Sequence, residues 1–81
     1  MEKHKLTIHR YTIVLEPAEE GGYVVTVPYL PGCATQGENF EEAISMAKEA
    51  IELYLETLKE HKEEIPVEPE GVVISEVVVN A

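Results

Sequence analysis

The fold is decided by the stretch Val25-Thr26-Val27-Pro28-Tyr29-Leu30-Pro31-Gly32-Cys33-Ala34-Thr35-Gln36-Gly37-Glu38-Asn39-Phe40-Glu41-Glu42-Ala43. Within it, Pro28 and Pro31 exclude a helix and favour an extended or turning path. Gly32 and Gly37 allow the backbone angles that tight reversals need. We therefore expect a strand to end here, the chain to turn, and a short polar strand to lead into a helix.

Three segments around this stretch have the pattern of strands: Leu6–Glu16, Tyr23–Val27 and Ala34–Glu38. The first two are rich in β-branched and aromatic residues, which favour strands. The polar loop between them is short enough for an antiparallel hairpin. Alternation assigns one set of side chains to the face under the helix: Tyr11, Ile13, Leu15, Tyr23, Val25 and Val27. Val14 and Val24 then point to the opposite face of the sheet.

One long helix is predicted from Phe40 to Glu60 or His61. Asn39 stands three residues before Glu42, the spacing of a capping box with Asn in place of Ser or Thr. An apolar stripe recurs at helical spacing, formed by Phe40, Ile44, Ala47, Ile51, Tyr54 and Leu58, with Ala43, Ala50 and Leu55 beside it. About 21 residues span roughly 32 Å, whereas strands of five to seven residues span only about 17–23 Å. We therefore expect Tyr54, Leu55 and Leu58 to need cover from the last segment or from a second molecule.

The end of the chain is predicted to add one more strand. Residues 63–71 form an acidic linker with spaced prolines, which favours an extended path. Residues 72–79 are mostly valine and isoleucine, so both faces of such a strand would be apolar. The expected fold is α+β and two-layered, β-β-β-α-β, with a small, mainly antiparallel sheet covered on one face by one long helix. We expect a single domain over residues 1–81, with residues 1–8 as an N-terminal arm or strand extension.

Charge is the strongest compositional feature of the 81 residues. Sixteen acidic side chains, all of them glutamate, stand against 6 basic ones, for a net charge of -10. A field of this sign repels phosphate and disfavours unaided binding to nucleic acid. It suits a basic protein partner, because complementary charge speeds encounter and selects the partner. Acidity that only keeps a small protein soluble explains the same composition, and both interpretations stay open.

The residues usually found in catalytic or metal sites are scarce. Cys33 is interpreted as a small buried residue in a turn. His4, His9 and His61 lie far apart and none stands at a metal-ligand spacing from Cys33. We expect no catalytic group, no cofactor and no metal, and hence no enzyme. The first residues of the chain carry charges that no apolar core follows, and the chain has no apolar run of about 20 residues. Both features favour a cytoplasmic protein that does not enter a membrane.

Several motifs together resemble the HicB-like antitoxin family. They are Gly21-Gly22-Tyr23, Val27-Pro28-Tyr29-Leu30-Pro31-Gly32-Cys33, Thr35-Gln36-Gly37-Glu38 and Glu42-Ala43, continuing through Glu49-Ala50-Ile51-Glu52-Leu53-Tyr54-Leu55. The resemblance covers about residues 11–56. The family often has Asp and Ser or Thr where this chain has Glu38 and Asn39.

This resemblance implies a partial ribonuclease-H-like module that acts as an antitoxin. Its partner would be a HicA-like toxin, a small basic protein that cuts mRNA with a catalytic His and is neutralised when the antitoxin masks its active site. Many members carry a DNA-binding domain after this module. The present sequence ends at Ala81, so we expect a short form without direct DNA binding.

Two other functions stay open. One is a stand-alone homo-oligomeric binding module with an unknown ligand, and the other, more remote, is a metal-dependent nuclease using carboxylates such as Glu16. Self-association into a dimer or tetramer is also expected, since one helix cannot cover all the apolar surface. The residues expected at a partner or oligomer interface are Val14, Val24, Tyr54, Leu55, Leu58, Val77 and Val78. The residues expected in the turn and cap are Pro28, Pro31, Gly32, Gly37, Asn39 and Glu42.

Overall fold

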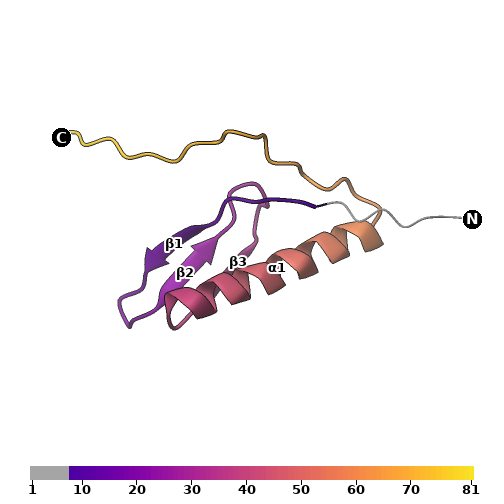
Figure 1. Ribbon diagram of the computed structural model, residues 1–81, viewed down its shortest axis with the longest axis horizontal. Helices are drawn as coiled ribbons and strands as arrows, with labels where there is room; N and C mark the ends of the chain where they lie inside the picture. Colours follow the sequence, from indigo (N-terminus) through magenta and orange to yellow (C-terminus); the bar gives the residue numbers. More distant parts are fainter. Residues whose placement is uncertain (1–7) are drawn as a thin grey trace, which may run out of the picture.

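The computed structural model describes residues 8–81, which form a three-stranded sheet followed by one long helix (Figure 1). The strands are β1 (Val14–Pro17), β2 (Tyr23–Thr26) and β3 (Ala34–Gly37), antiparallel and in the order β1-β2-β3. The helix α1 covers Phe40–Glu60. The small α+β fold, the three strands and the single helix are as predicted.

The strand register separates two faces. Leu15 is opposite Val25, which is opposite Thr35, and this face looks toward α1. Val25 is fully buried there against the helix alanines Ala43 and Ala47. Because successive residues of a strand point to opposite faces, Val14 and Val24 lie on the other face, as predicted.

The first strand is shorter than predicted. Of the segment Leu6–Glu16, the first two residues lie outside the described part of the chain, and the ladder to β2 begins only at Val14, opposite Thr26. Val27, the next residue along, directs its N–H to the β3 side, where it donates to the carbonyl of Cys33 at 3.2 Å. Pro28, which follows, has no N–H to donate. The turn after β2 therefore removes the pairing partners of the residues before Val14.

The Pro28–Pro31 loop builds a second part of the core. Leu30 is fully buried beside Val27 and Cys33. The loop is closed by backbone hydrogen bonds, from Leu30 N to Val27 O at 3.0 Å and from Cys33 N to Leu30 O at 2.9 Å. Gly32 has a φ of +82°, which a residue with a Cβ rarely adopts. The predicted turn and the buried position of Cys33 are confirmed.

The helix begins at the predicted cap. The Asn39 side chain accepts a hydrogen bond from the N–H of Glu42 at 2.8 Å. The Glu42 carboxylate in turn accepts from the N–H of Glu38, also at 2.8 Å. In a capping box the second bond would go to the cap residue itself, so this cap reaches one residue further back along the chain.

The apolar stripe of the helix is rotated from the predicted one. Its buried members are Ala43 and Ala47, while Phe40 and Ile44 are exposed by 58% and 40%. A Cβ built on Gly37 would lie 2.4 Å from the N atom of Ala43. Small residues therefore let the helix sit tightly on β3, which leaves Phe40 and Ile44 outside the contact. Phe40 packs edge-on against Tyr23, with ring centroids 6.5 Å apart.

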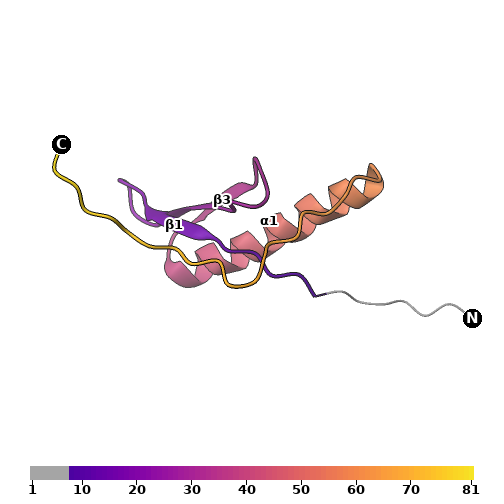
Figure 2. The same cartoon turned by 90° about the horizontal axis from the view of Figure 1, so that it is seen from above.

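The prediction of a fourth strand is wrong for this structure. Residues 72–79 are not paired with any strand among the described residues. After α1 the chain turns back, passes residues 10–12 and runs past the sheet on the side away from the helix (Figures 1 and 2). The sequence pattern favours an extended strand, but this path brings it into no ladder with β1.

Candidate partner-binding surfaces

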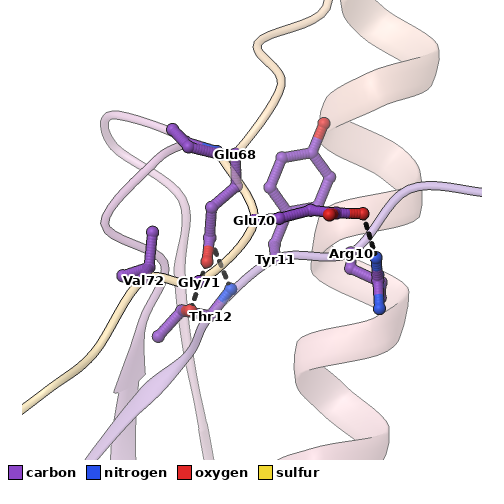
Figure 3. A pocket seen from close by; sticks show the side chains of 8 residues that line it. Arg10, Tyr11, Thr12, Glu68, Glu70, Gly71 and Val72 are labelled. Atoms are coloured by element: carbon purple, nitrogen blue, oxygen red, sulfur yellow. Dashed lines mark hydrogen bonds and ion pairs between the residues drawn. The ribbon is translucent and has the colours of Figure 1, made fainter.

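The linker is attached to the segment before β1 by side-chain hydrogen bonds (Figure 3). Glu68 accepts one from the N–H of Thr12 at 2.7 Å and a second, short one from the Thr12 hydroxyl. The Tyr11 hydroxyl donates to the carbonyl of Pro66. Burial, and secondly the nearby Glu68 carboxylate, raise the pKa of Tyr11 above its ordinary value of 10.0, so its hydroxyl stays a donor at neutral pH.

A further ion pair joins Arg10 to Glu70 at 3.2 Å, on the surface. Both side chains are more than three-quarters exposed, so solvent screens the pair and it contributes little. The linker is therefore held mainly by Thr12 and Glu68, with support from Tyr11.

These contacts determine where the chain goes next. The linker passes Thr12 at Glu68 and then runs in the same direction as β1 (Figure 1). A turn at Glu70 and Gly71, where Gly71 has a φ of +81°, then interrupts the extended path. Residues 72–79 follow this turn without pairing to β1 or to any other described strand, so the predicted fourth strand does not form.

The C-terminal segment, residues 72–79, is the most exposed apolar part of the described chain. Val77 is 85% and Val78 is 94% exposed. Its one charged residue is Glu76. An extended segment of this composition presents unpaired backbone groups and apolar side chains together, the combination by which strands add to other chains.

A second apolar surface is a groove of about 450 Å³ between the loop before β3 and the C-terminal half of α1. We call it the helix groove. Leu53 is 64% exposed there, and the Tyr54 hydroxyl fixes one side by donating to the carbonyl of Pro31 at 2.8 Å. The residues that line it carry no charge: Gly32, Cys33, Ala34, Ala50, Leu53, Tyr54, Thr57 and Leu58.

The third surface is an acidic hollow of about 690 Å³ where the β1–β2 loop meets the start of α1. Four glutamates line it, namely Glu19, Glu20, Glu38 and Glu42, together with Tyr23, Val24 and Met46. No lysine, arginine or histidine is among its lining residues. The hollow thus offers concentrated negative charge beside apolar side chains, a combination that suits a basic side chain.

The chemistry of Cys33 agrees with a structural role. Burial raises the pKa of its thiol, so the thiolate that would act as a nucleophile is disfavoured. Within residues 8–81, no three His, Cys, Asp or Glu side chains gather as a possible metal site.

The predicted interface residues fall on separate surfaces. Val14 and Val24 lie together on the outer sheet face, with Val24 40% exposed. Tyr54 and Leu58 line the helix groove. Tyr54 and Leu55 also pack against the cluster around Leu30, so the chain itself supplies part of the cover that we expected from elsewhere. Val77 and Val78 lie on the C-terminal segment, outside the other two groups.

Sequence reasoning missed two features. Leu53 was not recognised, although a leucine outside the helical stripe is a signal for an exposed apolar patch. The contact between Thr12 and Glu68 had no signal, because the two residues are 56 positions apart and neither belongs to a motif.

Comparison with known proteins identifies the class. Residues 11–78 match the profile of HicB-like antitoxins of bacterial toxin–antitoxin systems. The chain belongs to this family. It is 53% identical over 57 residues to the UPF0150 protein Ta0767 of Thermoplasma acidophilum, covering 70% of this chain and 83% of that protein. It is 46% identical over 72 residues to the UPF0150 protein ssr1765 of Synechocystis, covering 83% and 91%.

A longer relative carries the name Antitoxin HicB, in Escherichia coli. It is 42% identical over 57 residues, which are 70% of this chain but only 41% of that protein. The present chain therefore matches less than half of this longer antitoxin. Within the described residues, the structure has no helix with the length and apolar character needed to cross a membrane.

Proposed function

We propose that this protein is an antitoxin that binds a small basic HicA-like toxin and neutralises it by covering its active site. The match of residues 11–78 to the HicB-like antitoxin family carries the proposal. The protein acts by binding, without catalysis of its own, and it works in the cytoplasm, where mRNA is cut.

The acidic hollow supports this proposal with a surface of the right charge. A toxin that cuts mRNA needs a cationic surface, because RNA presents a phosphate on every nucleotide. Carboxylates in the hollow compete for that surface, and the net charge of -10 steers the two proteins together. The same net charge disfavours direct contact of this chain with DNA.

Co-expression tests the proposal. The reading frame adjacent to the gene is expressed alone and together with this protein, while growth is followed and complexes are recovered by pull-down. The proposal predicts that the neighbour arrests growth, that this protein restores it, and that the two are recovered together. A neighbour that arrests growth equally in the presence of this protein would refute it.

A charge-matched pair of variants locates the contact. The double variant Glu19→Gln and Glu20→Gln removes two charges from the acidic hollow. The control, Glu56→Gln with Glu60→Gln, removes two exposed charges from α1 outside it. Because local charge governs docking more than net charge does, only the first should slow association several-fold at low salt. Equal slowing by both would mean that the hollow has no special part.

A further inference from the structure

We infer that two copies of this protein associate by placing the C-terminal segment of each, residues 72–79, in the helix groove of the other. The inference rests on the apolar surfaces that the fold leaves open and on their charge. It is independent of the proposed toxin binding.

The C-terminal segment needs a partner outside its own sheet. Its residues Val73, Ile74, Val77, Val78 and Val79 are between 62% and 94% exposed. It pairs with neither β1 nor any other described strand. An uncovered extended apolar segment is a ready template for strand addition.

The helix groove offers what such a segment lacks. It begins at Ala34, the first residue of β3, and β3 is an edge strand among the described strands. An extended segment that follows the groove meets the edge of β3 at Ala34, where backbone groups are available, while its side chains reach Leu53 and Leu58. Eight extended residues span about 26 Å, enough to follow the groove along the second half of α1.

The segment does not reach the groove of its own chain. From Gly71 onward it runs away from the C-terminal half of α1, where the groove lies (Figure 1). In the same view, the sheet separates it from the helix. The two open apolar surfaces of one molecule therefore complement each other only between molecules.

Charge selects a second copy as the occupant. Two chains of net charge -10 repel each other, so they associate best where glutamates are absent. The helix groove has no charged lining residue, and the segment contains only Glu76. A basic protein would be drawn instead to the glutamate-rich surfaces. Reciprocal exchange of segments closes the contact with twofold symmetry.

Mass measurement in solution tests this, using light scattering with size-exclusion chromatography on full-length chains. The wild type should have twice the 9.0 kDa chain mass. Leu53→Glu in the groove and Val78→Glu in the segment should each give monomers. Both sites are well exposed, so the fold should persist, which circular dichroism checks. Val67→Glu is the matched control, because Val67 is 74% exposed but belongs to neither surface. It should remain dimeric.

Mixing the two variants distinguishes this arrangement from a dimer in which the same surface of each molecule meets. Leu53→Glu retains an intact segment and Val78→Glu retains an intact groove, so an equimolar mixture can form one intact contact per pair. Dimers should reappear in the mixture at high concentration, although neither variant forms them alone.

Three results would overturn the inference. They are a monomeric wild type at the highest soluble concentration, a dimer that survives both charge substitutions, and a mixture that stays monomeric. Toxin binding that is lost in Leu53→Glu, with a monomeric wild type, would assign the groove to the toxin instead.

Discussion

Glu68 accepts two hydrogen bonds from Thr12, one from its backbone N–H at 2.7 Å and one from its hydroxyl. These residues are 56 positions apart, yet one carboxylate fixes where the chain travels after the helix. The linker is held beside the segment before β1. The apolar residues 72–79 follow it unpaired, and most of their side chains are exposed.

Replacing Glu68 should free the linker. Glu68→Ala removes the acceptor of the Thr12 N–H, and hydrogen bonds to charged groups contribute about 1.5–3 kcal/mol before screening by solvent. Hydrogen exchange at the Thr12 amide should become at least about tenfold faster. Glu64→Ala is the control, since it removes an exposed glutamate of the same linker. Unchanged exchange in Glu68→Ala would show that the linker is held by other contacts.

Tyr11 should make stability depend on pH in the alkaline range. Its hydroxyl donates to Pro66, and its pKa is raised by burial and by Glu68. Ionisation is therefore harder in the folded state, so the stabilisation is complete below the ordinary pKa of 10.0 and is lost as pH rises through the folded pKa. Urea unfolding should show this loss in the wild type.

The variant Tyr11→Phe should lower the unfolding free energy by about 1 kcal/mol at neutral pH, since one hydrogen bond is lost. Its unfolding free energy should then fall less between about pH 9 and pH 11 than that of the wild type. Tyr29→Phe alters a tyrosine of the β2–β3 loop and serves as the control. An alkaline loss of the same size in Tyr11→Phe and wild type would exclude Tyr11 as its source.

Gly37 should tolerate no side chain. A Cβ there would lie 2.4 Å from Ala43 N and 2.6 Å from Ala43 Cα, both backbone atoms that cannot move aside cheaply. Overpacking of this kind costs about 1–3 kcal/mol, or more. Gly32→Ala is the comparison, because its added methyl meets open space and only the positive φ opposes it, at about 1–2 kcal/mol. Chemical denaturation should show the larger loss for Gly37→Ala, and the reverse order would contradict the close packing of α1 on β3.

The helix cap should make a measurable contribution. Asn39→Ala removes the acceptor of the Glu42 N–H and should cost about 1 kcal/mol of unfolding free energy. Ser45→Ala, at an exposed position inside α1, is the control and should change stability little. A loss in Asn39→Ala no larger than in Ser45→Ala would show that solvent replaces the cap.

The sequence predicts the local elements well. The prolines at 28 and 31, Gly32 and the cap at Asn39 act through neighbouring residues, and each has the predicted part in the structure. Gly37 does not supply the predicted backbone angle, because its φ is not positive; it is needed instead because a Cβ there would meet the backbone of Ala43. The two faces of the sheet follow from alternation alone. Such features depend on backbone sterics and on short-range hydrogen bonds, which a sequence pattern records directly.

Long-range features could not be read in the same way. The valines of residues 72–79 predict an extended strand, but no described strand pairs with them, and such pairing depends on segments far apart in the sequence. Phe40 and Ile44 share the helical stripe, yet they are exposed because Gly37 and Ala43 set the position of α1 on the sheet. The helix groove depends on the loop around Pro31 meeting Tyr54, a contact between residues 23 positions apart.

The most direct test of the antitoxin function is RNA cleavage by the purified product of the adjacent reading frame, with increasing amounts of this protein. Cleavage should fall in proportion to the protein added and cease once every toxin molecule is bound. Raised salt should weaken inhibition, because exposed charges are screened within about 8 Å at physiological ionic strength. Cleavage that continues unchanged with this protein in excess, at low salt, would contradict the account.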